Sequence, residues 1–423
     1  MTTCPVTHDY NPLDPSTGVD PYPVLSRLRA EGPVFYLPEL GHHIVTRFDD
    51  IEAILMDRDT WSAANASSPF NPVCPAAQQV LDTGFKRVPT LNNADPPRHG
   101  PMRKSVLSVM TPRRLQALEP TLRDYAENLV REFWDKPVVD FIHEFAFPFP
   151  GFAGFSLLGF PESDTQMLKE WSATRVLLTY GGLPEEEQVA TARDIVSMWR
   201  YVEDFVAARA ASPVDDLTSD LLRLAHAKPE QLNQFDIVNI VYSMSLAAHD
   251  TTTNTIGNGM LALLRDRTQW ERIVDDASLI PTAIEEILRF DTAVPNHRRV
   301  AKVDTKIGDV DVPAGSRIMM CFASANRDPS SFGDDADDFR IDRKDAEFQL
   351  SFGKGAHLCL GRPLARLEVQ ITLELLRVLT PDIELVPDQE IRYHPSAMTR
   401  SLQSLLVAPR GLVRAREKGV LPA

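Results

Sequence analysis

Along most of this chain, apolar residues recur at the spacing of an amphipathic helix. The longest such run covers residues 234–266, with apolar side chains at Ile237, Ile240, Val241 and Met244, and predicts a helix roughly 45–50 Å long at about 1.5 Å per residue. Shorter helical patterns cover residues 20–32, 49–58, most of 99–227, 267–276, 281–290 and 359–379.

Short β-prone runs fill much of the remainder. Residues 34–47 read as a hairpin around Gly41. Further strands are expected at residues 298–303, 307–312, 316–322, 383–385 and 404–407. No internal repeat and no break in composition is present, so we expect one domain over residues 1–423, mainly α with small peripheral β-sheets.

Two segments depart from these patterns. Residues 60–97, rich in Pro, Asn, Ser and Ala, predict a long irregular stretch, which fits a functional loop or an ordinary surface loop equally well. Residues 141–160 are dense in Phe, Pro and Gly and interrupt the helical pattern. We expect their aromatic side chains to pack in the core rather than to bind a ligand.

Composition narrows the class of protein. With 43% hydrophobic and 24% charged residues the chain can bury a large core. The net charge of −15, without a basic stripe, argues against binding to nucleic acid or to an anionic membrane. No uninterrupted apolar run reaches about 18 residues, and the polar start of the chain shows no signal peptide, so we expect a cytoplasmic protein.

The cysteines favour one reactive site. Cys4, Cys74, Cys321 and Cys359 are widely separated and form no CxxC pair, so neither a disulfide framework nor a cysteine-rich zinc site is indicated. Only Cys359 lies in a glycine-rich loop that leads into a predicted helix. Backbone N–H groups at a helix start favour the thiolate, which can ligate a metal whose other ligands come from elsewhere, as in a porphyrin.

The residues around Cys359 resemble the haem-binding signature of the cytochromes P450, Phe-Gly-x-Gly-x-His-x-Cys-x-Gly. The matching residues are Phe352, Gly353, Gly355, His357, Cys359 and Gly361. The resemblance implies a cytochrome P450-like fold, with haem b between the long central helix and the cysteine loop and with Cys359 as the axial iron ligand. It also implies that His357 and Arg298 pair with the haem propionates.

A second motif lies in the middle of the predicted long helix, where residues 247–252 read Ala-Ala-His-Asp-Thr-Thr. Asp and Thr are poor helix formers, and a local opening of the helix there would make a groove for a diatomic ligand and water. The run resembles the family's Ala-Gly-x-Asp/Glu-Thr motif, which implies that Asp250 and Thr251 handle the protons of O2 activation. Ala248 stands where the family usually has glycine, so a slightly narrower groove is expected.

Weaker motifs follow in the order that the family shows. Glu286 and Arg289 resemble its Glu-x-x-Arg pair, and Arg343 resembles the third member of that structural network. His99 and Arg103 resemble its His-x-x-x-Arg motif, which implies further contacts to the propionates. Alone, each of these patterns would usually be a surface feature.

By resemblance, the function is insertion of one oxygen atom of O2 into a small, largely apolar substrate, by hydroxylation, dealkylation or epoxidation. The position of the motifs implies a substrate pocket that includes Ala247, Ala248, Val294 and Asn296. No flavin or nicotinamide motif is visible, so we expect the electrons to come from a ferredoxin or flavin-type donor, or from a fused reductase in a longer chain. The protein itself is expected to be a monomer. The basic residues expected to face a donor are Arg103, Lys104, Arg113, Arg114, Lys354, Arg362 and Arg366.

Three alternatives remain at this point. A haem-thiolate peroxygenase would use H2O2 directly and would not need the Asp250–Thr251 pair. A haem-binding sensor without turnover would need neither this pair nor a deep pocket. A protein without haem would carry the cysteine loop by coincidence.

Overall fold

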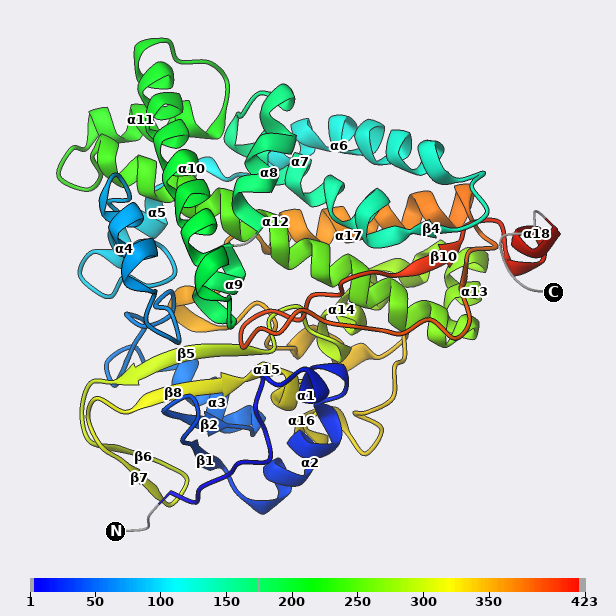
Figure 1. Ribbon diagram of the computed structural model, residues 1–423, viewed down its shortest axis with the longest axis horizontal. Helices are drawn as coiled ribbons and strands as arrows, with labels where there is room; N and C mark the ends of the chain where they lie inside the picture. The colour runs from blue at the N-terminus through cyan, green and yellow to red at the C-terminus, as the bar shows by residue number, and fades with distance from the viewer. Residues whose placement is uncertain (1–3, 174, 418–423) are drawn as a thin grey trace.

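The computed structural model describes residues 4–173 and 175–417. Helices dominate them (Figure 1). The α-helices are α1 (Pro15–Val19), α2 (Tyr22–Glu31), α3 (Phe48–Met56), α4 (Pro75–Asp82), α5 (His99–Val109), α6 (Pro112–Phe133), α7 (Pro148–Leu158), α8 (Thr165–Ala173), α9 (Arg175–Tyr180), α10 (Glu185–Ala211), α11 (Leu217–Ala227), α12 (Gln234–Arg265), α13 (Arg267–Asp275), α14 (Ile280–Phe290), α15 (Phe322–Ala325), α16 (Pro329–Phe332), α17 (Arg362–Leu379) and α18 (Leu412–Glu417).

The strands form small sheets at the periphery. They are β1 (Val34–Leu37), β2 (His42–Val45), β3 (Trp61–Ser62), β4 (Val139–Asp140), β5 (Asn296–Ala301), β6 (Thr305–Ile307), β7 (Val310–Val312), β8 (Arg317–Cys321), β9 (Glu384–Leu385) and β10 (Leu406–Ala408). The largest sheet has the order β1-β2-β8-β5-β3, in which only β2 and β8 run parallel. The other two sheets are β4-β10-β9 and the hairpin β6-β7.

Helices and the main sheet occupy different parts of the molecule. Figure 1 shows α12 crossing the helical part, with α17 beside it and the sheet of β1, β2, β5 and β8 below. The 32 residues of α12 begin at a capping box, in which Asn233 and Asp236 bond to each other's backbone N–H groups. Helix α12 packs against α7, α10, α14 and α17, so most of the core is built around it.

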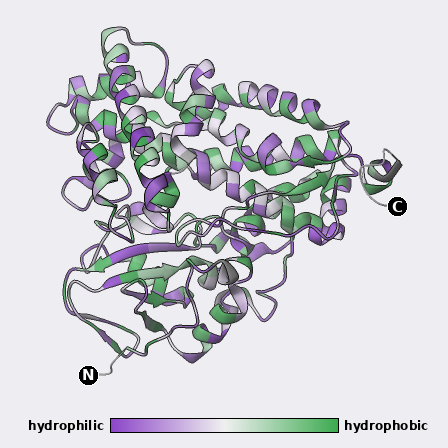
Figure 2. Ribbon diagram, viewed as in Figure 1, coloured by the Kyte–Doolittle hydropathy of each residue, from purple (hydrophilic) through white to green (hydrophobic). Residues whose placement is uncertain are grey.

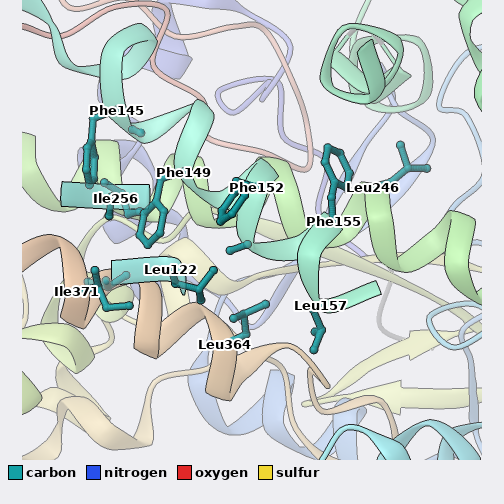
Figure 3. Close-up of a cluster of buried hydrophobic side chains, with 14 of the residues drawn as sticks. Leu122, Phe145, Phe149, Phe152, Phe155, Leu157, Leu246, Ile256, Leu364 and Ile371 are labelled. Carbon is teal, nitrogen blue, oxygen red and sulfur yellow. The ribbon is translucent and has the colours of Figure 1, made fainter. Parts of the chain in front are cut away.

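Phenylalanines of α7 and the π-helical turn before it fill the core beside α12. Phe145, Phe149, Phe152 and Phe155 lie against side chains of α6, α12 and α17 (Figure 3). Burying rings of this size is a large favourable contribution to folding. The aromatic residues of 141–160 therefore pack in the core as expected. The segment itself is helical, whereas its glycines and prolines suggested an interruption.

Several boundaries match the sequence-based predictions, and others do not. The hairpin at Gly41, the long helix and the mainly α architecture are confirmed. The predicted strand at 307–312 is instead the hairpin β6-β7, which turns at Gly308. The segment 60–97 contains α4, whose Ala77 packs with Ala192 of α10. Figure 2 shows hydrophobic and hydrophilic residues along each long helix, as one buried and one exposed face require.

Candidate active site

The cysteine loop is fixed by its own backbone. The Cys359 N–H donates to the Phe352 carbonyl at 2.9 Å, which closes the loop. Gly355 has φ of +68°, and a Cβ there would lie 2.5 Å from the Leu55 carbonyl oxygen. Only glycine satisfies both conditions. The loop is thus held tightly between α3 and α17.

The Cys359 thiol lies among backbone N–H groups and arginine side chains. Its side chain is accessible, yet burial among protein atoms raises the pKa of the thiol. The N–H groups of Gly361 and Arg362 and the charges of Arg103 and Arg362 oppose that rise. Helix α17 begins at Arg362, three residues later than expected, with Gly361 as its N-cap. The N–H groups at the helix start therefore favour the thiolate as expected, but burial outweighs them, and Cys359 itself lies outside the helix.

Cationic and imidazole groups gather beside this loop. The rings of His99 and His357 stack with centroids 4.0 Å apart, and His357 Nδ1 lies 3.1 Å from the Leu91 carbonyl oxygen. Burial, followed by the charges of Arg299 and His99, lowers the pKa of His357 to about 3. His99, His357 and Arg299 line a pocket of about 180 Å³ that also includes Asp95.

Arg299, and not Arg298, is the arginine of this pocket. Successive side chains of a strand point to opposite faces, and both residues belong to β5. Arg298 points away from His357, donates to the Ala66 carbonyl at 3.3 Å and lies over the Phe70 ring at 4.1 Å. Arg298 therefore lies outside the pocket that His99 and His357 line, contrary to the expectation, and Arg299 lies inside it.

These residues fit a haem. The Nε2 atom of His99 is buried without a hydrogen-bond partner. Both carboxylates of the pocket are already bonded, Asp95 to Ser62 and to the Ala63 N–H, and Asp57 to the N–H groups of Asp59 and Thr60. Donors without acceptors call for an anionic group, and an accessible thiol without other metal-ligating side chains around it calls for a metal that brings its own further ligands. The residues described contain no His, Cys, Asp and Glu cluster for a bare metal ion.

Arg103 reaches the cysteine loop rather than the imidazole pair. Its guanidinium donates to the Leu358 carbonyl, and the charge of Cys359 raises the pKa of Arg103 against the lowering by burial. Of the two residues predicted from the His-x-x-x-Arg motif, His99 lies in the pocket with Arg299, and Arg103 lies beside the cysteine loop.

The centre of α12 carries the second motif. Ala247 is exposed, between buried Leu246 and half-buried Ala248, and Thr251 Oγ1 donates to the Ala247 carbonyl at 2.9 Å. The helix runs unbroken through this point, so the expected local opening is absent. Ala248 instead points at α7, where a Cβ on Gly154 would lie 2.6 Å from its methyl group. It is a packing residue and not a wall of the pocket.

The carboxyl group of Asp250 has a raised pKa. Burial raises the pKa of its carboxyl from 3.8 to about 7, and the charge of Arg175 opposes the rise. Its Oδ2 has no hydrogen-bond partner, and its Oδ1 lies 3.3 Å from Nδ1 of His249. The His249 ring lies 4.7 Å from that of Phe147. Asp250 can therefore hold or release a proton at neutral pH.

The predicted wall residues differ in their surroundings. Val294 is half-buried just before β5. Asn296 is fully buried, with Nδ2 donating to the Ala397 carbonyl at 2.8 Å and Oδ1 3.4 Å from the Tyr10 hydroxyl. Because its side chain is fully engaged, Asn296 joins β5 to the C-terminal loop and does not offer a free contact to a substrate.

Comparison with known proteins decides the family. Residues 197–379 match the family model for cytochrome P450. Cytochrome P450 107B1 of Saccharopolyspora erythraea is 33% identical over 377 residues, 86% of this chain and 89% of that protein. The chain belongs to the cytochrome P450 family. It is a P450 monooxygenase, and members of the family carry haem b and use O2.

Two solved structures are similar along nearly the whole P450 chain. One is cytochrome P450 CREJ in complex with (4-ethylphenyl) dihydrogen phosphate, at 34% identity and TM-score 0.90, covering 95% of this chain and 99% of that one. The other is an intact type IV self-sufficient cytochrome P450 monooxygenase, at 34% identity and TM-score 0.93. The match covers 99% of this chain and 56% of that one.

Beneath the cysteine loop of this P450, Glu286 and Arg289 form a fully buried ion pair. Two bonds of 2.7 and 2.9 Å join them, and neither side chain is exposed. Arg343 adds a 3.4 Å contact to Glu286 and donates to the carbonyls of Phe332 and Asp335. The network ties α14 to the irregular chain that leads into the cysteine loop.

Replacing Glu286 with glutamine should destabilise the P450 by about 3–5 kcal/mol, because Arg289 would remain buried without its counter-charge. Urea unfolding measures this loss, and the haem content of the purified variant should fall with it. The matched control is Glu127→Gln, which breaks the exposed pair with Arg131 and should cost less than about 0.5 kcal/mol. Equal losses in both variants would contradict a special role for the buried network.

Proposed function

We propose that this P450 inserts one oxygen atom of O2 into a small, largely apolar organic substrate by hydroxylation, dealkylation or epoxidation. In this proposal Cys359 would ligate the haem iron, and His99, Arg299 and His357 would hold its propionates. The observation that carries it is the presence of an accessible thiol at Cys359, in its glycine-rich loop, together with a buried acid at Asp250 whose pKa is raised to about 7. Asp250 belongs to α12, and Cys359 lies three residues before α17. These two helices pack against each other.

Bound haem supplies the reduction of O2, in which two electrons and two protons leave one oxygen atom in the substrate and one in water. The protein must deliver those protons without admitting bulk water to the site. Asp250 is placed for this because at pH 7 it is present in both protonation states. Thr251 offers a hydroxyl one residue further along α12, and Ala247 leaves space beside that hydroxyl.

Purified protein with a surrogate ferredoxin and its reductase tests the reaction. With ¹⁸O2, one labelled oxygen atom should appear in the product of a screened substrate, and the rate should depend on the electron donor. H2O2 alone should support much slower turnover. Faster turnover with H2O2 than with O2 and donor would favour the peroxygenase, and ligand binding without turnover would favour a sensor.

The electron donor is proposed to be an acidic ferredoxin or flavin-type protein that docks near Cys359. Of the predicted basic face, Arg103, Arg114, Lys354 and Arg366 are already bonded within the protein. Lys104, Arg113 and Arg362 are exposed and form no ion pair in the described chain. These three are therefore the residues available to steer a partner.

Reversing the charge of Lys104, Arg113 and Arg362 to glutamate should slow reduction by an acidic ferredoxin about 10-fold or more at low salt, because electrostatic steering is lost. Stopped-flow reduction at several ionic strengths measures the effect, which should shrink as salt rises. The control, Arg193→Glu, alters an exposed arginine of α10. If that variant slowed reduction equally, docking at this face would be ruled out.

We also propose that the protein is a monomer and acts in the cytoplasm. No helix within residues 4–173 and 175–417 is both long and apolar enough to cross a bilayer. The relation to a self-sufficient P450 makes a fused reductase a second arrangement for the electron supply. Reduction of the isolated chain by added ferredoxin at a catalytically useful rate would favour the separate donor.

A further inference from the structure

Arg175 is buried and Arg87 is half-buried, and neither has a carboxylate partner in the described part of the chain. Arg87 lies in the connection between α4 and α5, and Arg175 opens α9 with 9% of its surface exposed. Among the described residues, neither has an acidic oxygen within 4.0 Å. An arginine is rarely buried unless its charge is balanced. Both positions therefore require an explanation.

The surroundings of the two arginines offer donors but few acceptors. Arg87 donates one long bond of 3.3 Å to Ser67 Oγ, and its Nε has no partner. Arg175 lies over the ring of Tyr242, 5.9 Å from its centroid. The Tyr242 hydroxyl is buried without a hydrogen-bond partner. Burial, together with the charge of Arg175, lowers the pKa of Arg87 to about 10, so the two cations are close enough to repel.

Arg298 shows how the same fold satisfies a buried arginine. Its guanidinium donates to the carbonyls of Ala66 and Ser68 and lies over the Phe70 ring. Arg87 and Arg175 have no such set of carbonyls. The charge of Arg175 does act on Asp250, but the two form no ion pair. With its pKa near 7, Asp250 is also partly neutral at physiological pH.

The pair lies close to the proposed reaction site. Arg87 is four residues before Leu91, whose carbonyl contacts His357, and four extended residues span at most about 14 Å. Along α12, Tyr242 precedes Ala247 by about 7.5 Å and Thr251 by about 13.5 Å, at 1.5 Å per residue. A molecule of moderate length can therefore touch both arginines and the centre of α12.

We propose that Arg87 and Arg175 bind an oxyanion of the substrate, a carboxylate or a phosphate monoester, while an apolar part reaches the haem. The inference rests on the proposed function and names the substrate class for that site. Guanidinium groups bind such anions through paired charge-assisted bonds. The Tyr242 hydroxyl supplies one further donor. The oxidised carbon would lie about 7–14 Å from the anion.

Pairs of anionic and neutral ligands test this class of substrate. The four probes are 4-butylbenzoate, its neutral amide, 4-butylphenyl phosphate and neutral 4-butylphenol. Affinity is measured by spin-state titration and, independently of the haem, by calorimetry. The wild type should bind each anion at least about 10-fold more tightly than its neutral counterpart. Tighter binding of the phosphate, or of the benzoate, would identify which oxyanion the site prefers.

Substitutions of Arg87 and Arg175 test where the anion binds. Arg87→Gln and Arg175→Gln should each weaken binding of the preferred anion by about 10- to 100-fold and leave the neutral probes within about 2-fold. Arg87→Lys and Arg175→Lys, which keep the charge, should recover part of the affinity. The control Arg193→Gln, at an exposed arginine of α10, should change nothing.

Two outcomes would overturn the inference. One is a wild type that binds the neutral probes as tightly as the anions, and the other is an equal loss of anion and neutral binding in the glutamine variants at unchanged melting temperature. Failure of the proposed function would look different. The reduced carbon monoxide complex would then lack a thiolate-type absorption band, whereas calorimetry would still report the anion preference.

Discussion

Replacing Cys359 with serine is expected to abolish oxygenation and to remove the strongly red-shifted Soret band of the reduced carbon monoxide complex. That band requires a thiolate trans to carbon monoxide, and a serine hydroxyl does not replace a soft, electron-donating sulfur ligand. Product formation should fall below detection. The melting temperature should fall only as far as haem binding is weakened, because the Cys359 thiol itself forms no core packing.

The matched control is Cys74→Ser. Cys74 is a second free thiol, buried before α4, and it lies outside the glycine-rich loop. This variant should keep both the red-shifted band and the activity. A red-shifted band that survived in Cys359→Ser would show that another residue ligates the iron. A wild type whose band resembles that of histidine-ligated haem would refute thiolate ligation in a folded sample.

Local motifs were the most predictable part of this protein. The cysteine loop could be predicted because its fixed positions lie within ten consecutive residues, where Gly353 and Gly355 adopt the positive φ that favours glycine. The ends of α12 could be predicted because its apolar spacing persists through 32 residues. In both cases the signal and the structure that it describes are close together in the chain.

Tertiary placement was less predictable. Arg298 and Arg299 are adjacent, and only the register of β5 against β8 decides which of them faces His357. Helix α4 has eight residues in a proline-rich segment and gains its support from α10. Asp335 lies in an acidic run, residues 334–338, whose local pattern is that of a solvated loop, but it bonds to Arg343 of the buried network.

Arg87 and Arg175 carry no motif at all. They come from segments 88 residues apart in the sequence, and only the packing of α9 and the 83–98 connection over α12 brings both to Tyr242. The same holds for the pKa of Asp250, because the charge of Arg175 acts on it from another helix without forming an ion pair. Sequence spacing can indicate that an acid is functional, but the charges that set its pKa come from the fold.

Asp250→Asn should slow product formation by about 10²- to 10⁴-fold, the usual contribution of a positioned acid or base. Electron donor and O2 should still be consumed, but more of the O2 should leave as H2O2, since its second oxygen atom departs as water only after a second proton arrives. In the wild type, turnover should change as the pH crosses about 7, because burial places the pKa of Asp250 there. The variant should lose that inflection.

The folded protein's stability gives a second readout that does not depend on turnover. An acid whose pKa rises from 3.8 to about 7 on folding destabilises the native state as the pH rises between those two values, and the cost is full above 7. Asp250→Asn should therefore raise the melting temperature at pH 8 relative to the wild type and leave it unchanged near pH 4. Asp194→Asn, at an acid of α10 away from the site, serves as the control for activity. If Asp250→Asn kept wild-type turnover and H2O2 release, protons would have to enter by another route.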